Sequence, residues 1–251
     1  MQHSKAGLIR YLFITVALVE LYAEFTHQRS LMFFFKPFSL PLLAAYYFVS
    51  VKGEWNRIHK WMVLALIFSG LGTIFLMFAP ETPIDTELMG LPKSRYFFLA
   101  GVGSFFVTQV LFIYSFLKSV SISNPGKPKL NKAIYLPFFV YWVVILLVII
   151  PPLYANPEKQ LATVPVMFYS AVLIGMGAAA LSRYRKTNSQ SFWFTFIGAC
   201  LFIVSDSLIS INFLALPAPN YYANFSIVIT YLLAEYLIAD GMLKHYSTDA
   251  E

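Results

Sequence analysis

The sequence predicts an all-α fold, a polytopic membrane helix bundle with eight transmembrane helices and both termini in the cytoplasm. Of its 251 residues, 59% are apolar and 12% are charged, and the mean hydropathy is +0.67. A soluble domain is about 45–50% apolar and about 25% charged, so this chain needs lipid as part of its solvent. A membrane β-barrel would instead show short strands of alternating polarity. We expect residues 1–251 to form a single domain.

Eight apolar runs are each long enough to cross a bilayer, for which a helix needs about 20 residues. Several connections between them are very short, which predicts antiparallel hairpins. No small-residue cleavage site follows the first run, so we expect it to be retained as a span. The predicted spans are residues 7–24, 31–51, 59–79, 96–117, 134–154, 161–181, 192–214 and 222–243.

The basic residues are distributed unevenly between the two sides that eight spans define. Positive charge gathers on the cytoplasmic side of membrane proteins, so the richer side, which carries both termini, is predicted to be cytoplasmic. These loops suit anionic lipid headgroups, and we expect no nucleic-acid partner. The richer side holds Lys5, Arg10, Lys52, Arg57, Lys60, Lys118, Lys127, Lys129, Lys132, Arg183, Arg185, Lys186 and Lys244, and the other holds Arg29, Lys93, Arg95 and Lys159.

The first two spans carry charged residues of both signs. Glu20 and Glu24 are four residues apart and share a helix face, where like charges repel each other. Lys36 lies at a similar depth in the second span and is the natural partner, with Arg29 as a second candidate. Two interpretations stay open: a structural ion pair that joins the two spans, or a role in substrate binding.

Prolines lie in the second and fifth spans, and small residues gather in the sixth. Prolines are common in membrane helices, where they can kink a span. Gly175 and Gly177 precede three alanines in the sixth span and would permit close helix packing, either within the chain or in a homodimer. The prolines are Pro37, Pro41, Pro137, Pro151 and Pro152.

The seventh span contains an aspartate in an otherwise apolar stretch, GACLFIVSDSLIS. Asp206 lies near the predicted membrane midplane, where a charge costs about 2.5–3.5 kcal/mol to insert, so such residues are usually functional. Ser210 shares its helix face, and Ser205 and Ser207 flank it and are expected to bond the carboxyl group. The alternative is a structural carboxyl group that ties helices together.

The eighth span contains two further acidic residues. Glu235 lies near the midplane, like Asp206, whereas Asp240 is near the cytoplasmic end and is expected to be solvated there. The single cysteine, Cys200, lies in an apolar run and is expected to be a packing residue. One cysteine can form neither an intrachain disulfide nor a thiolate metal cluster.

Residues 202–208 read FIVSDSL, with a serine–aspartate pair at 205–206. Four further segments are KPFSLPLL at 36–43, FSGLGTIFLM at 68–77, GVGSF with Gln109 and Tyr114 at 101–114, and YLLAEYLIADG at 231–241. In chain order, along almost the whole chain, the five segments resemble motifs of the YhhN family, the lysoplasmalogenase-like membrane proteins, and FIVSDSL is similar to the serine–aspartate signature of that family.

The resemblance implies hydrolysis of the vinyl ether bond of a lysoplasmalogen, a membrane lipid, without a metal or organic cofactor. It also implies two carboxyl groups, one that protonates the vinyl ether carbon and one that activates water. Thr73 stands where the family has an aspartate, Gln109 where it often has histidine, and Glu235 where it has glutamine. The candidate catalytic residues are Asp206 and Glu235, and the candidate substrate-binding residues are Lys36, Thr73, Gln109, Ser205, Ser210 and Glu20.

Three functions stay open from the residues. A hydrolase would need Asp206 and Glu235 within about 5–9 Å of each other, by analogy with paired-carboxylate hydrolases. A relative that binds lipid or a partner without catalysis would have these carboxyl groups tied up in hydrogen bonds. A transporter or proton relay would also use intramembrane carboxyl groups, but broken-helix repeats are absent from the sequence. The basic loops and compact length favour a bacterial inner membrane.

Overall fold

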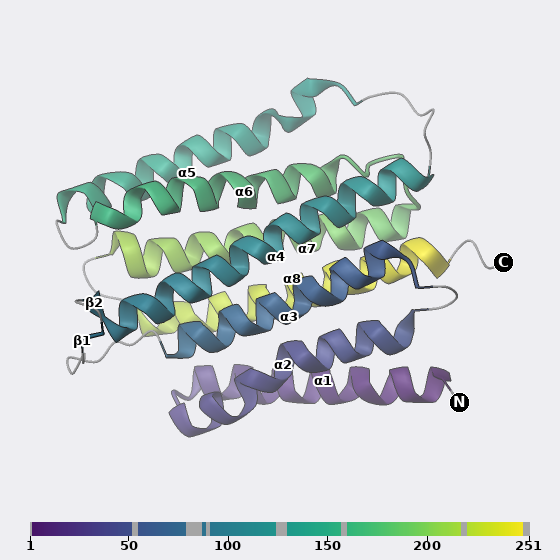
Figure 1. Ribbon diagram of the computed structural model, residues 1–251, viewed down its shortest axis with the longest axis horizontal. Coiled ribbons are helices and arrows are strands. Elements are labelled where there is room, and N and C mark those ends of the chain that lie inside the picture. The colour runs from purple at the N-terminus through teal and green to yellow at the C-terminus, as the bar shows by residue number, and fades with distance from the viewer. Residues whose placement is uncertain are drawn as a thin grey trace. The chain divides into compact units, whose positions relative to one another are not determined.

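The computed structural model describes residues 2–51, 55–78, 87–88, 91–123, 130–156, 160–216 and 220–247. These residues form eight α-helices and one short antiparallel strand pair, β1 (Glu87–Leu88) with β2 (Leu91–Pro92) (Figure 1). Short 3-10 turns precede α5 and α6, and a π-helical segment, Ser210–Ala215, continues α7. The helices are α1 (Gln2–Phe25), α2 (Arg29–Ser50), α3 (Arg57–Met77), α4 (Lys93–Ser123), α5 (Leu136–Ala155), α6 (Thr163–Leu181), α7 (Ser189–Ile209) and α8 (Tyr221–Ser247).

The prediction of eight spans is confirmed. In the described part of the chain, eight helices are long and apolar enough to cross a membrane, which indicates an integral membrane protein. The helix ends differ from the predicted ones, because α4 continues to Ser123 and α8 to Ser247. A helix does not have to end where its apolar residues end, since its backbone bonds are internal to the segment.

The side of the membrane on which each loop lies stays a prediction. Four of the loop lysines on which it depends lie outside the described residues, and two basic residues at the start of α4 have side chains that are not described. The former are Lys52, Lys127, Lys129 and Lys159, and the latter are Lys93 and Arg95.

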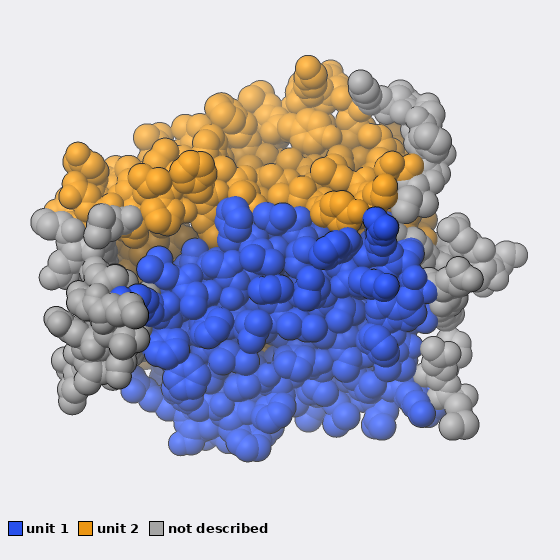
Figure 2. Space-filling view, viewed as in Figure 1, with its two compact units in different colours: residues 1–112 blue, residues 113–251 orange. Residues whose placement is uncertain are grey.

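The chain divides into two compact units, residues 1–112 and residues 113–251 (Figure 2). The boundary falls inside α4, so this helix begins in unit 1 and ends in unit 2. The prediction of a single domain stays a prediction, and each unit is described by itself.

In unit 1, α2 packs against both α1 and α3. Pro37 and Pro41 lie inside α2 without ending it, as is common where neighbouring helices support the backbone in a membrane. A Cβ at Gly70 of α3 would lie 3.1 Å from Leu40 Cβ, so glycine lets α2 and α3 approach closely. Asn56 begins α3 by accepting the His59 backbone N–H at 3.1 Å.

In unit 2, α7 and α8 form the most extensive helix pair. A Cβ at Gly198 would lie 2.8 Å from the Ala234 carbonyl oxygen, and one at Gly241 would lie 2.6 Å from Thr195 Oγ1. Gly177 of α6 has the same role, because a Cβ there would lie 2.5 Å from Phe138 Cε1 of α5. Packing within the chain therefore accounts for Gly177, one of the two glycines considered for a homodimer face.

Arg183, counted above among the loop charges, is fully buried at the end of α6. Its guanidinium group donates to Ser191 Oγ at 2.6 Å and to the sulfur of Met242, and it lies over the ring of Phe116. Ser191 Oγ in turn donates to the Gly241 carbonyl oxygen at 2.6 Å. Arg183 thus joins α6 to α7 and α8, and its stem is packed rather than solvated.

Candidate functional site

Asp206 lies on α7 and is buried among α5, α6 and the π-helical segment of unit 2. The hydroxyl group of Tyr169, from α6, donates to Asp206 Oδ2. Among the described residues, no lysine, arginine or histidine forms an ion pair with this carboxyl group. Its partner is therefore a neutral donor, which is unusual for an acidic group buried in a membrane helix.

A second tyrosine reaches the same turn of α7. Tyr141 of α5 donates its hydroxyl proton to Ser207 Oγ at 2.8 Å, and Ser207 Oγ donates to the Ile203 carbonyl oxygen at 2.7 Å. Tyr141, Tyr169, Asp206 and Ser207 are called the tyrosine–aspartate cluster below. The cluster joins three helices through hydroxyl groups and one carboxyl group.

The two tyrosines were not among the predicted site residues. Tyrosine in a membrane helix usually lies at the interface with water, where its ring is apolar and its hydroxyl group is hydrated. Tyr141 and Tyr169, however, lie well inside the predicted spans 134–154 and 161–181. A hydroxyl group at that depth needs a hydrogen-bond partner within the protein. The position of the two tyrosines inside the spans is therefore the feature of the sequence that could have identified them as site residues.

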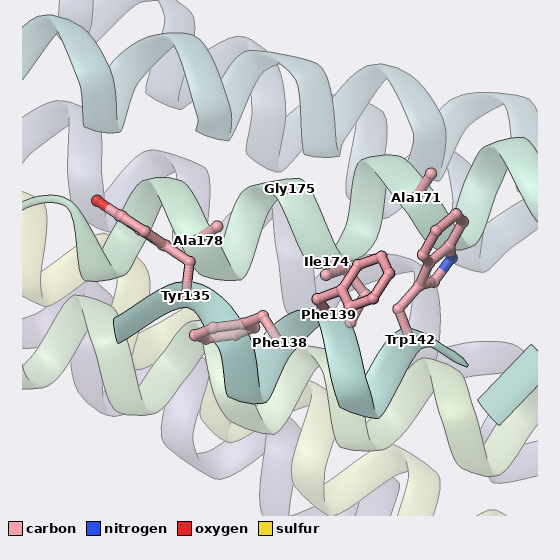
Figure 3. A pocket seen from close by; sticks show the side chains of 8 residues that line it. All are labelled: Tyr135, Phe138, Phe139, Trp142, Ala171, Ile174, Gly175 and Ala178. Atoms are coloured by element: carbon pink, nitrogen blue, oxygen red, sulfur yellow. The ribbon is translucent and has the colours of Figure 1, made fainter. Parts of the chain in front are cut away.

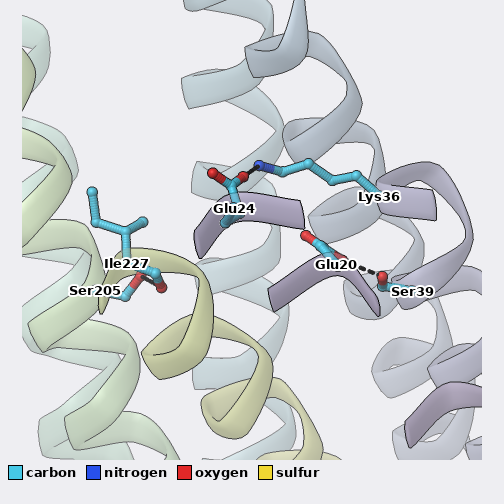
Figure 4. A network of polar contacts seen from close by, with 6 residues as sticks. All are labelled: Glu20, Glu24, Lys36, Ser39, Ser205 and Ile227. Atoms are coloured by element: carbon cyan, nitrogen blue, oxygen red, sulfur yellow. Dashed lines mark hydrogen bonds and ion pairs between the residues drawn. The ribbon is translucent and has the colours of Figure 1, made fainter. Parts of the chain in front are cut away.

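The serines next to Asp206 do not bond its carboxyl group, which corrects the expectation. Ser205 Oγ donates to the Ile227 carbonyl oxygen of α8 at 3.0 Å, and Ser207 bonds Ile203 and Tyr141 (Figure 4). Successive residues of an α-helix point about 100° apart, so neighbours of Asp206 face other helices.

Ser210 is linked to Asp206 through the backbone. Its N–H donates to the carbonyl oxygens of both Asp206 and Ser207, at the point where α7 changes to π-helical geometry. Such segments are rare and are frequently found at functional sites. Asn212, buried in this segment, accepts the Asn220 N–H at 2.7 Å and donates to the Asn220 carbonyl oxygen at 3.2 Å. These bonds hold the end of the α7–α8 hairpin beside the cluster.

Glu235 is fully buried on α8, at a different level from Asp206. Ser205 contacts Ile227, and a Cβ at Gly198 would lie between Ala234 and Ile238, so the antiparallel register places Glu235 near residue 199 of α7. That position is about seven residues from Asp206, or about 10 Å along the helix axis. The side chain that reaches Asp206 is that of Tyr169, and the register does not bring Glu235 to it.

The predicted ion pair between the first two spans is present. Lys36 Nζ lies 2.9 Å from Glu24 Oε1, and the Ser39 hydroxyl group donates to Glu20 Oε2 (Figure 4). Glu20 and Glu24 are both buried, so α1 and α2 are joined by two polar contacts inside their interface. Here, in unit 1, the carboxyl groups have a cation.

The remaining predicted residues lie on α3, α4 and α8. Thr73 is buried, and its hydroxyl group donates to the Ser69 carbonyl oxygen at 3.1 Å, one turn back in α3. Gln109 is fully buried on α4, and within the described residues its amide group has no hydrogen-bond partner. Asp240 is also mostly buried and is paired with Lys244 at 2.9 Å, whereas solvation was expected.

The described residues contain no group of three or more His, Cys, Asp or Glu side chains arranged to hold a metal ion. A model of the YhhN family matches residues 31–242, which include Lys36, Thr73, Gln109, Asp206 and Glu235. No curated protein and no solved structure matches the chain.

Proposed function

The chain belongs to the YhhN family, and on that premise we propose that it is a lysoplasmalogenase-like membrane hydrolase. Its substrate is a lysoplasmalogen or a related single-chain ether lipid, and it cleaves the vinyl ether bond. One observation carries the proposal: Asp206 is a buried carboxyl group whose partner is a tyrosine hydroxyl group rather than a cation. Hydrocarbon tolerates the neutral acid far better than the anion, and the neutral acid is a proton donor.

In the first step, Asp206 gives its proton to the vinyl ether carbon that is not bonded to oxygen. The positive charge that forms is shared between the neighbouring carbon and the ether oxygen. Because Tyr169 occupies Oδ2, Oδ1 is the oxygen that carries the proton. The tyrosine hydroxyl group then stabilises the carboxylate left behind through a charge-assisted hydrogen bond.

In the second step, water adds to the positively charged carbon and its proton returns to the Asp206 carboxylate. The resulting hemiacetal breaks its bond to the glycerol oxygen, and its hydroxyl proton passes to that oxygen. The products are a fatty aldehyde and a glycerophospho-alcohol, and one water is consumed. Asp206 acts first as acid and then as base, as the acid/base carboxyl group of retaining glycosidases does, but here no second carboxyl group acts as a nucleophile.

The proposed cycle requires one carboxyl group, whereas the family resemblance implies two. Thr73, where the resemblance implies an aspartate, is not an acid or a base near neutral pH, and its hydroxyl group bonds Ser69. Glu235 lies about two helical turns from Asp206 along α7. The substrate-binding roles of Gln109 and Ser210 stay predictions, whereas the polar groups of Lys36, Glu20 and Ser205 form contacts within the protein.

The test is aldehyde release from a vinyl-ether lysophospholipid by the detergent-purified protein. We expect Asp206→Asn to abolish release while the protein stays folded, because asparagine keeps the size of the side chain and removes the acid. Glu235→Gln is the matched comparison, and we expect it to retain release. Loss of release in Glu235→Gln alone would overturn the single-carboxyl cycle, and absence of release from the wild type would overturn the hydrolase.

The second candidate is a relative that binds a single-chain lipid without hydrolysing it. The observation that favours it is Thr73, which replaces one of the two carboxyl groups that the resemblance implies. It predicts saturable lipid binding by both the wild type and Asp206→Asn, with no aldehyde from either.

For its setting, we propose a bacterial inner membrane, with both termini in the cytoplasm. The basic residues described above support this orientation. Labelling of single cysteines placed in the loops, in a variant without Cys200, tests it. Labelling of the two termini from opposite sides would contradict it. A homodimer also stays a prediction, and its test is the mass of the detergent-solubilised protein.

A further inference from the structure

A groove with a volume of about 280 Å³ lies between α5 and α6 in unit 2 (Figure 3). Aromatic side chains of α5, Phe138, Phe139 and Trp142, form one wall. The other wall is α6, where Gly175, Ile174 and two alanines line the groove. The alanines are Ala171 and Ala178.

The two glycines of α6 differ in the space beside them. A Cβ at Gly177 would lie 2.5 Å from Phe138 Cε1 and 2.6 Å from Ile203 Cδ1, so that position is filled by neighbouring helices. A Cβ at Gly175 would touch only Ile113 Cδ1, at an ordinary 3.7 Å. Gly175 lines the groove, so a larger side chain there has room, and we expect it to narrow the groove.

Apart from Tyr135, which carries a hydroxyl group at the far end from Trp142, the lining of the groove suits a hydrocarbon chain rather than a polar ligand. The indole N–H of Trp142 already donates to Ser170 Oγ at 3.0 Å, so it is not available to a ligand. α5 belongs to the most hydrophobic span of the eight, with a mean hydropathy of 2.7, and few residues of this span are buried, so we expect the groove to open towards lipid. Pockets for whole drug-sized ligands start at about 300 Å³, so this groove has room for one alkyl chain rather than a two-chain phospholipid.

One end of the groove adjoins the tyrosine–aspartate cluster. Trp142 forms that end, and its partner Ser170 follows Tyr169 directly in the sequence. Tyr141, the residue before Trp142, bonds Ser207 beside Asp206. From the level of Tyr135 to that of Trp142 the groove runs along α5 for about 10 Å. A larger and more open hollow of about 550 Å³, which Tyr141 also lines, is formed by α5 and its preceding turn alone, and so it does not enclose a chain between two helices.

We propose that the α5–α6 groove binds the alkyl chain of the substrate lipid and that Gly175 sets the length of chain that fits. This proposal rests on the proposed function. The vinyl ether is next to the headgroup of a lysoplasmalogen, so a chain that leaves the cluster at Trp142 lies along Phe138 and Gly175. The groove takes a single chain, which is the class of lipid that the hydrolase would cleave.

The first experiment compares hexadecenyl and butenyl vinyl-ether lysophosphoethanolamine as substrates for Gly175→Leu, because the butenyl chain is too short to reach Gly175 from the Trp142 end. A methylene group in an apolar pocket is worth about 10- to 200-fold, so we expect kcat/KM for the long chain to fall at least about tenfold. The short chain should be cleaved at nearly the wild-type rate. Gly103→Leu is the matched control, because a Cβ at Gly103 of α4 has nothing within 4 Å. Equal losses on both substrates, or no loss on either, would overturn the proposal.

The second experiment does not depend on catalysis. In a variant whose sole tryptophan is Trp142, a saturated ether lysolipid with a brominated chain should quench the fluorescence, and Gly175→Leu should weaken the quenching. A sole-Trp193 variant is the control, since Trp193 is exposed on α7 outside the groove. Quenching without aldehyde release would refute the hydrolase and keep the groove. If Gly175→Leu leaves the quenching of Trp142 unchanged, the groove is refuted. It is also refuted if Gly175→Leu converts a dimer of the protein to a monomer without changing the chain-length preference.

Discussion

Among the buried acidic sites of the described residues, those around Glu24 and Asp206 have opposite forms of compensation. In unit 1, Glu24 is paired with Lys36 at 2.9 Å, and Glu20 accepts the Ser39 hydroxyl group beside them. In unit 2, Asp206 accepts a tyrosine hydroxyl group, and no described cation forms an ion pair with it. In unit 1, the Lys36 cation neutralises the charge of the Glu24 carboxylate. In unit 2, the Asp206 carboxyl group is neutral only when it binds a proton.

This difference separates a structural role from a chemical one. A buried ion pair holds its partners in place, and removal of one partner leaves an uncompensated charge that costs about 3–5 kcal/mol. A carboxyl group held by a neutral donor can lose and regain a proton without breaking such a pair. The prediction that Lys36 pairs with the acidic residues of span one is confirmed, and we interpret that pair as structural.

Of the substitutions that test this comparison, Asp206→Asn is expected to have the largest effect. Because general acid catalysis contributes about 10²- to 10⁴-fold, Asp206→Asn should lower kcat for aldehyde release by at least that much. Thermal unfolding in detergent should change little, because asparagine can still accept the Tyr169 hydroxyl proton. A variant that is unfolded and inactive together would assign Asp206 the same structural role as Glu24.

The next effect is expected in unit 1 and concerns stability. Lys36→Met leaves the Glu24 carboxyl group buried without its cation, and we expect the free energy of unfolding to fall by about 3–5 kcal/mol. The double variant Lys36→Met, Glu24→Gln removes both charges and should recover most of that loss. If the single and double variants unfold alike, the pair contributes no coupling energy and its structural role is refuted.

A smaller effect is expected from the partner of Asp206. Tyr169→Phe removes the hydroxyl group that stabilises the carboxylate formed in the first step. Hydrogen bonds to charged groups contribute about 1.5–3 kcal/mol, which corresponds to about 10- to 100-fold in kcat. The measurement is the rate of aldehyde release at saturating substrate. A change in KM alone would show that Tyr169 binds substrate without acting on the carboxyl group.

The smallest effect is expected at Ser205, next to Asp206 in sequence but directed at α8. Ser205→Ala removes a bond to the Ile227 carbonyl oxygen, and such bonds between membrane helices average about 0.6 kcal/mol. We expect a slight loss of stability, measured by thermal unfolding, and unchanged aldehyde release. A loss of activity comparable with that of Tyr169→Phe would indicate that Ser205 acts on the carboxyl group after all.

Two of the predicted residues show how far spacing along a helix can be trusted. The depth of Lys36 in its span predicts the pair with Glu24, and the pair is present. The connection between α1 and α2 is short, so the two helices are antiparallel in one register, and residues at the same depth meet. Glu235 was assigned to Asp206 from depth as well. The packing of α7 against α8, which depends on Gly198 and Gly241, instead places it nearer residue 199.

The sequence by itself determined the eight spans, the position of the acidic residues within them and the ion pair of the first hairpin. These follow from the thickness of the bilayer and the rise of a helix, which act on each segment separately. The tertiary structure decided that Tyr169 and Tyr141 meet the Asp206 turn, that Arg183 is buried, and that Gly175 rather than Gly177 faces a groove. Those contacts depend on the rotation of each helix about its own axis, which is set by the packing of side chains between helices.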